Sequence, residues 1–135
     1  MRLWHYKLIP YLPDKMLISQ WRECIAIKRQ WEKGTLKHRL VNYIKDYDES
    51  LFLYYVSLIT DEMFKRQIRF QIKYYKEIKD FCNNKKLADR YSEHNDRYLK
   101  QCYYNLQEKY DRGIITNEEW NSIHKNIYGE INNKI

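Results

Sequence analysis

Apolar residues recur along this chain at intervals of three, four and seven positions, which places side chains on one face of an α-helix. Asp14, directly after Pro13, is a good N-cap, and Gly34 is placed to end a helix. The sequence therefore predicts a first helix from Asp14 to about Lys33. Its apolar stripe comprises Leu17, Trp21, Cys24, Ile25 and Trp31.

The residues before this helix are of a different kind. Residues 1–13 contain Pro10 and Pro13, and proline removes a backbone donor and disfavours a continuous helix. We therefore expect an extended N-terminal arm that leads into the first helix.

A longer pattern begins near Asp48 to Ser50, after residues 35–48, which predict a short amphipathic segment or an irregular loop. Its early turns carry two apolar stripes, so we expect a central helix that buries both: Phe52, Val56, Ile59 and Met63, and Leu51, Tyr55 and Leu58. The pattern continues to Cys82 through Phe64, Ile68, Ile72, Tyr75 and Ile78, and Asn83-Asn84 marks a break.

The last third of the chain predicts a helical hairpin. A helix is expected from about Leu87 to Asp111, with Leu99, Tyr103, Leu106 and Tyr110 inward. Gly113 suits a left-handed C-cap, and Thr116-Asn117-Glu118-Glu119 is a capping box that opens a final helix. That helix is expected to bury Trp120, Ile123, Ile127 and Ile131.

Composition supports an all-α fold. Only 3 glycines and 2 prolines occur in 135 residues, so turns are scarce and the elements must be long. We expect a single compact domain of about four helices, with the N-terminal arm and the C-terminal hairpin. Within it, residues 1–82 form the helical core with the arm, and residues 83–135 supply C-terminal helices that pack on it.

The chemistry of the chain is limited in other ways. Cys24, Cys82 and Cys102 form no CxxC pair and have no histidine at ligand spacing, so we expect no metal site, no disulfide and no cofactor. The longest apolar run, residues 51–59, is too short to span a bilayer, and no signal peptide is recognisable. We expect a cytoplasmic monomer without a membrane partner.

The net charge of +7 is concentrated in one part of the chain. Residues 1–46 hold ten Lys and Arg against four Asp and Glu, whereas residues 47–135 hold fifteen against fourteen. A basic excess confined to one segment indicates a surface that faces a polyanion, most often nucleic acid. No nucleotide-binding, hydrolase or metal motif accompanies it.

Five segments carry a resemblance to a known family. They are the MRLWH start, the LIPYLP arm, LISQWREC in the first helix, KHRLVNY and EMFKRQI. Over roughly residues 1–70 the chain resembles the pyrimidine dimer DNA glycosylases, whose founding member is a small phage enzyme, and it looks closest to the bacterial and viral branch. The resemblance implies an all-α domain whose N-terminal arm threads between helices.

The resemblance also implies a mechanism for cutting damaged double-stranded DNA at pyrimidine dimers or abasic sites. The N-terminal amine attacks C1′ of the nucleotide and forms an imine, and β-elimination then nicks the strand. Arg2 is too large to favour removal of the initiator, so we expect the amine to belong to Met1; the alternative is that other processing exposes the amine of Arg2. Glu23 matches the carboxylate that handles protons, and Arg22 matches a neighbouring residue that grips DNA. An α-amine has a pKa of ~7.7–8.0 against ~10.4 for lysine, so more of it is neutral near pH 7.

We expect further DNA contacts from cationic side chains and from histidines, of which His5 lies near the amine in sequence. Where the family places a basic residue one turn beyond the glutamate, this chain has Ala26, and Arg29 or Lys28 is expected to substitute. The proposed DNA-binding residues are Arg2, His5, Arg22, Lys28, Arg29, Lys33, Lys37, His38 and Arg39.

Two other interpretations remain open at this point. The chain could be a non-catalytic DNA- or RNA-binding protein that keeps the fold and the charge. It could also be a protein-interaction module that uses the C-terminal hairpin, with the basic first third serving only solubility. Salt dependence of DNA affinity separates these, because phosphate contacts give a steep loss of affinity with salt.

Overall fold

The computed structural model describes residues 1–82 and 90–132, and no strand occurs in this part of the chain. The predicted all-α fold is therefore confirmed. Five α-helices and two 3-10 helices follow one another in this order: η1 (Tyr6–Tyr11), α1 (Asp14–Lys33), η2 (Asn42–Asp46), α2 (Glu49–Lys65), α3 (Ile72–Phe81), α4 (Asp96–Asp111) and α5 (Asn117–Asn132).

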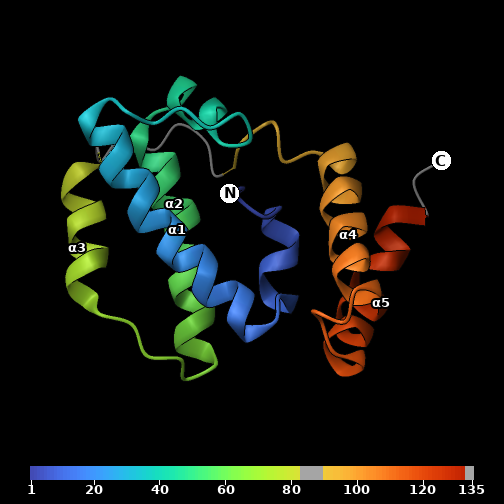
Figure 1. The fold of residues 1–135 in the computed structure, drawn as a ribbon. Coiled ribbons are helices and arrows are strands. Elements are labelled where there is room, and N and C mark those ends of the chain that lie inside the picture. The colour runs from blue at the N-terminus through green and yellow to red at the C-terminus, as the bar shows by residue number, and fades with distance from the viewer. Residues whose placement is uncertain (83–89, 133–135) are drawn as a thin grey trace.

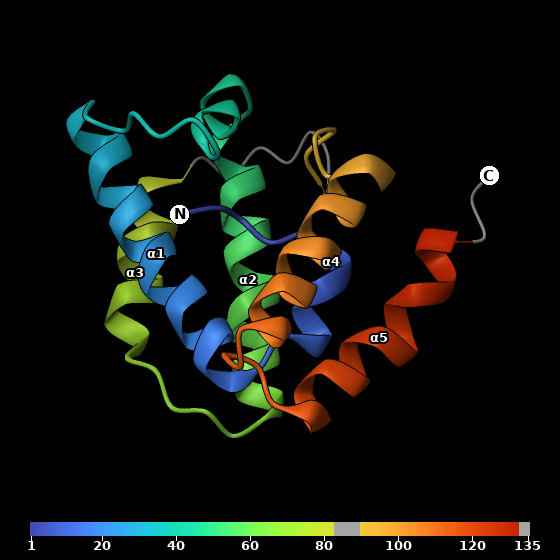
Figure 2. The ribbon, with the colours of Figure 1, turned by 45° about the vertical axis from the view of Figure 1, so that its right-hand side comes forward.

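The helices form two groups with the N-terminal arm between them. In Figure 1, α1, α2 and α3 pack together on one side, while α4 and α5 form a hairpin on the other. Figure 2, turned by 45°, also shows the first residues passing between α1 and α4. The 3-10 helix η1 contacts both α2 and α5, so the arm joins the two groups.

The hydrophobic core runs through both groups. Both predicted stripes of α2 face it: every member is buried except Leu58, which is partly buried. The arm also belongs to the core, because four of its apolar side chains are at most 2% exposed, namely Leu3, Leu8, Ile9 and Leu12. Removing that apolar surface from water stabilises the arm in its place between the helices.

The arm is less extended than its prolines suggested. Residues 1–5 lack helical structure, but residues 6–11 form η1 with Pro10 inside it, and the His5 side chain accepts a hydrogen bond from the Lys7 amide at its start. A short 3-10 turn tolerates proline, since few of its amides need a partner. The start of α1 also differs by one residue, because Pro13 is the N-cap and Asp14 is already helical.

The prediction of one helix from about residue 48 to Cys82 is wrong. The helix α2 ends at Lys65, and α3 begins only at Ile72. Gln67 has a φ of 61°, and the amides of Gln67 and Ile68 bond to the carbonyls of Phe64 and Met63, which is a Schellman cap. No glycine marks this cap, so the continuous apolar pattern concealed it.

The C-terminal hairpin forms as predicted, although α4 starts later. Residues 90–95 are not helical, and α4 begins at Asp96 because the Asn95 side chain accepts the Tyr98 amide as an N-cap. The predicted start at Leu87 and the break at Asn83-Asn84 lie outside the described residues. Gly113 has a φ of 78°, and Thr116 and Glu119 exchange two hydrogen bonds as a capping box.

Two further features concern the cysteines and whether a helix could span a membrane. The three cysteines are buried and free. Within residues 1–82 and 90–132, no helix has both the length and the apolarity needed to cross a membrane.

Candidate active site

The start of the arm meets the middle of α1 at Gln20. This side chain is 1% exposed, and its amide nitrogen donates to the Arg2 carbonyl and to Oε2 of Glu23, both at 2.9 Å. Its amide oxygen accepts the Trp4 amide at 2.8 Å. One side chain thus ties two residues of the arm to the carboxylate of Glu23.

Two tyrosines hold the same stretch of arm from other helices. The Tyr55 hydroxyl on α2 donates to the Trp4 carbonyl at 2.6 Å and lies 3.0 Å from the Gln20 amide oxygen. The Tyr98 hydroxyl on α4 donates to the Leu3 carbonyl at 2.5 Å. The carbonyls of residues 2–4 and the Trp4 amide are therefore satisfied by side chains, as buried main-chain polar groups require.

The positive charge of the N-terminus acts on Glu23. Glu23 is half-buried, and burial raises the pKa of its carboxyl above the ordinary value, while the positive N-terminus opposes this and lowers the pKa. Met1 is 37% exposed, so the amine-bearing residue is open to solvent. The charge of the N-terminus therefore reaches the Glu23 carboxyl, and Gln20 links that carboxyl to the carbonyl of Arg2, the residue next to Met1.

The next part of the arm faces away from solvent. His5 is 1% exposed and stacks on His94, with ring centroids 5.5 Å apart, and the Tyr43 hydroxyl lies 2.7 Å from Nε2 of His94. Burial lowers the pKa of His5 to about 4 and that of His94 to about 3, so both rings are neutral near pH 7. Lys7 pairs with Glu130 of α5 at 3.1 Å. His5, expected at the DNA surface, is instead part of the interior packing.

Arg66 fixes the other end of the arm. Its guanidinium donates to the backbone carbonyls of Ile9, Pro10 and Leu12 at 2.6–3.3 Å. It also pairs with Glu62 at 2.8 Å and with Asp14 at 2.9 Å. The C-cap residue of α2 therefore holds the end of η1 against the start of α1.

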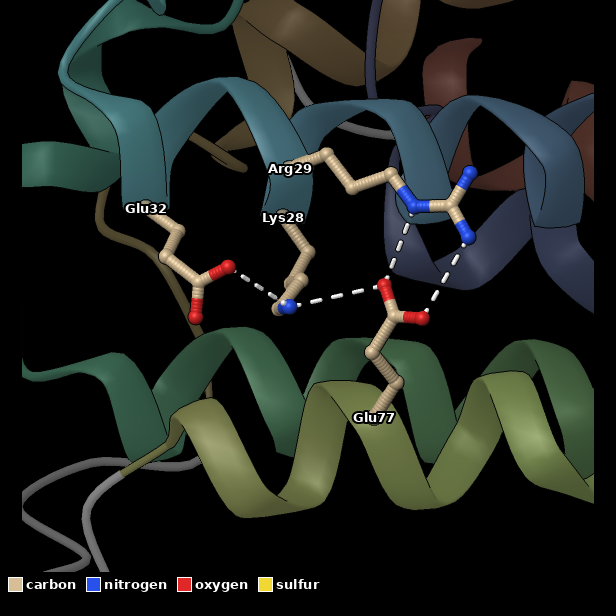
Figure 3. A network of polar contacts seen from close by, with 4 residues as sticks. All are labelled: Lys28, Arg29, Glu32 and Glu77. Atoms are coloured by element: carbon tan, nitrogen blue, oxygen red, sulfur yellow. Dashed lines mark hydrogen bonds and ion pairs between the residues drawn. The ribbon is translucent and has the colours of Figure 1, made fainter.

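Two of the expected phosphate-binding cations are engaged with carboxylates. Lys28 is 6% exposed and pairs with Glu32 at 3.0 Å and with Glu77 of α3 at 3.4 Å. Arg29 donates to both Glu77 oxygens, at 3.0 and 3.3 Å (Figure 3). Figure 3 shows Glu77 reaching from α3 towards both cations of α1. These pairs fasten α3 to α1 and leave less positive charge for a ligand.

The remaining expected contacts lie nearer the surface. Arg22 follows Trp21 on α1 and is exposed. Arg2 is half-buried, with its guanidinium 5.5 Å from the centre of the Trp4 ring, and His38 is half-buried with its backbone amide bonded to Asn42. Three more cations are exposed and have no ion pair with any residue in the described part of the chain: Lys33, Lys37 and Arg39.

Sequence reasoning missed the residues that hold the arm. The position of Gln20 offered one signal. It is a polar residue beside the apolar stripe of α1, four positions after Met16 and three before Glu23, so one helical turn separates it from either residue. Tyr55 lies in an apolar stripe and was correctly predicted as buried, but nothing in its position reveals its hydroxyl's partner. Tyr98 lies 95 residues from its partner Leu3, and no local pattern could have linked them.

Comparison with known proteins supports the interpretation of the arm and α1. Neither curated proteins nor solved structures provide a match to this chain. The model of the family described as pyrimidine dimer DNA glycosylase matches residues 1–76, which is more than half of the chain and includes Met1, Gln20 and Glu23. The chain therefore belongs to the pyrimidine dimer DNA glycosylase family, a family of DNA-repair glycosylases.

Proposed function

We propose that this protein is a DNA glycosylase and abasic-site lyase that works through an imine on its N-terminal amine, without metal or cofactor. The observation that carries the proposal is the link through Gln20 between the Arg2 carbonyl, next to the N-terminal amine, and the carboxylate of Glu23, whose pKa the N-terminal charge lowers. A nucleophile beside a carboxylate that accepts and returns protons is the arrangement that covalent amine catalysis needs.

The proposed reaction has two stages. The neutral amine of Met1 forms a bond to C1′ of the damaged nucleotide, the glycosidic bond breaks, and the base leaves with the bonding electrons and takes up a proton. The C1′–O4′ bond then breaks, O4′ takes up the proton that the attached nitrogen has lost, and the opened sugar carries an imine at C1′. At an existing abasic site, the amine instead adds to the aldehyde and water leaves. Loss of a C2′ proton from the imine then expels the 3′ phosphate by β-elimination. Glu23 takes and returns protons in these steps.

The burial of Glu23 suits that role. Because burial raises the pKa of its carboxyl, the group is a stronger base when ionised than an exposed glutamate, and it holds a proton over a wider pH range. Exposed Arg22, next to Glu23 in the sequence, is proposed to bind a phosphate beside the lesion.

The proposed phosphate contacts fall into two sets. Exposed cations without an ion pair to a described residue are ready to contact DNA: Arg22, Lys33, Lys37 and Arg39. Lys28 and Arg29 are proposed contacts only if phosphate competes with Glu77. Arg2 is half-buried against Trp4 and is proposed to act close to the sugar, while buried His5 supports the arm.

Borohydride reduction tests the covalent intermediate. The protein is mixed with duplex DNA that carries either one abasic site or one pyrimidine dimer, and sodium borohydride is added. We expect a covalent adduct, and peptide mass spectrometry should place it on the fragment containing Met1. An adduct on a lysine side chain, or one that survives acetylation of the α-amine, would exclude the proposed nucleophile.

Glu23→Gln tests the carboxylate with little change of shape. We expect this variant to bind the same abasic duplex while its rate of strand cleavage falls at least about 100-fold, the lower range for a lost acid-base group. The second measurement is the salt dependence of DNA binding by the wild type. Steep salt dependence without any adduct would favour a non-catalytic DNA-binding protein, and flat dependence would favour a protein-interaction module.

A further inference from the structure

Gln20 uses every polar atom of its amide at the junction of arm and helix. Its nitrogen has two hydrogens, and one goes to the Arg2 carbonyl while the other goes to Oε2 of Glu23. Its oxygen accepts the Trp4 amide and contacts the Tyr55 hydroxyl. A buried amide is costly unless all its hydrogen bonds are made, so this side chain has a single stable orientation.

This orientation constrains both proposed reacting groups at once. The Arg2 carbonyl belongs to the residue next to the amine, and the same nitrogen that binds it also binds Glu23. Rotation or loss of the amide would therefore move the amine and the carboxylate relative to each other. Gln20 binds Oε2 of Glu23, and no hydrogen bond from residues 1–82 or 90–132 goes to Oε1.

We propose that Gln20 is a positioning residue that sets the register of the N-terminal amine against Glu23 and leaves Oε1 of Glu23 as the proton carrier. The inference rests on the proposed function, because it assigns a task to Gln20 within the imine reaction. Gln20 does not contact the substrate in this assignment, and it acts through the arm backbone and through Glu23.

Two substitutions separate the two halves of the amide. Gln20→Leu has a similar volume and removes all four contacts. Gln20→Glu keeps the acceptor for the Trp4 amide and the Tyr55 hydroxyl, but an ionised carboxylate cannot donate to Arg2 or Glu23. It also adds negative charge beside Glu23, which raises the pKa of the Glu23 carboxyl further.

The experiment measures single-turnover imine trapping by borohydride, together with affinity for a duplex containing an uncleavable abasic analogue. Because a displacement of 1 Å can cost about 100-fold in rate, we expect trapping by Gln20→Leu to fall about 10- to 100-fold. Affinity should stay within about 3-fold of the wild type, since phosphate contacts dominate it. For Gln20→Glu, the rate relative to wild type should rise as pH falls, because the protonated side chain regains a donor.

A control variant accounts for general loss of stability. Tyr103→Phe removes a buried hydroxyl that lies 2.6 Å from Nδ1 of His124, between α4 and α5 and away from the arm. All rates are measured at a temperature at which circular dichroism shows each variant folded. Tyr103→Phe should trap DNA at the wild-type rate.

The outcomes distinguish the two proposals. A wild type that forms no adduct overturns the imine mechanism and the role of Gln20 with it. A wild type that forms the adduct, with both Gln20 variants trapping at its rate, keeps the imine mechanism and overturns the positioning role. Equal losses of rate and affinity in Gln20→Glu, independent of pH, would also overturn it, because they indicate a damaged DNA surface.

Discussion

The clamp formed by Arg66 makes a quantitative prediction about the arm. The perturbation is Arg66→Met, which keeps the aliphatic stem but removes the guanidinium from three backbone carbonyls. The side chain of Arg66 is 20% exposed, so water replaces these hydrogen bonds only in part. The carbonyls lie at the end of η1, where no helical amide follows to satisfy them.

The expected magnitude follows from the two carbonyls on buried residues, Ile9 and Leu12. Hydrogen bonds from charged donors contribute about 1.5–3 kcal/mol each, and partial replacement by water reduces this to about 1–1.5 kcal/mol each. The free energy of unfolding should fall by about 2–3 kcal/mol. At roughly 3–5 °C per kcal/mol for a chain of this size, the melting temperature should fall by about 6–15 °C.

Thermal unfolding followed by circular dichroism measures this change. Glu62 has a side chain only 11% exposed and would lose its partner, so the double variant Arg66→Met with Glu62→Gln isolates the loss at the carbonyls. Arg66→Lys keeps the charge but cannot reach three carbonyls with one ammonium group. A melting temperature for Arg66→Lys within about 2 °C of the wild type would refute the clamp.

Three further predictions concern charge and backbone strain. Glu77→Gln should lower the melting temperature at neutral pH, and the difference from the wild type should vanish in acid. Hydrogen bonding to Arg29 lowers the pKa of Glu77, so the stabilisation by its carboxylate is present above the unfolded pKa and is lost as pH falls. If the freed cations contact phosphate, fluorescence anisotropy should also show a steeper salt dependence of DNA affinity for this variant. The pKa of His94 is lowered to about 3 and that of His5 to about 4, so both rings resist protonation in the folded state. In denaturant titrations, the free energy of unfolding should therefore be constant above about pH 6.5 and fall below it by up to ~1.4 kcal/mol per pH unit for each histidine. His94→Asn should reduce that slope. Gln67→Gly should raise the free energy of unfolding by about 0.5–1 kcal/mol in urea titrations, because glycine adopts a φ of 61° without the cost that glutamine has there; an unchanged midpoint would show that the cap holds no strain.

Local signals in the sequence predicted most of the helices. Gly34 and Gly113 both take the left-handed conformation that ends a helix, and the capping box at Thr116 opens α5. The boundary between α2 and α3, which the sequence did not predict, is also a Schellman cap, but there glutamine occupies the left-handed position. Residue type therefore predicted the caps only where the residue is one that prefers that backbone conformation.

Some features of the candidate site could be predicted from the sequence, and others could not. Glu23 lies in the helix that directly follows the arm, so a link between this helix and the arm could be predicted from the resemblance of a contiguous segment. The pairing of Lys28 and Arg29 with Glu77 could not, because their partner lies 48 or more residues further along. A cluster of cations in sequence predicts potential for phosphate binding, but the fold decides how many of them remain unpaired.

The hydrogen bond from Tyr98 to Leu3 has a consequence for the order of assembly. Protein synthesis makes the arm before α4 and α5, and early segments generally start to fold first. Here, however, the arm receives a donor from α4 and an ion pair from α5, at Glu130. The nascent arm therefore lacks part of its binding surface until α4 and α5 have been made, so the arm precedes these helices in synthesis but reaches its final place only after them.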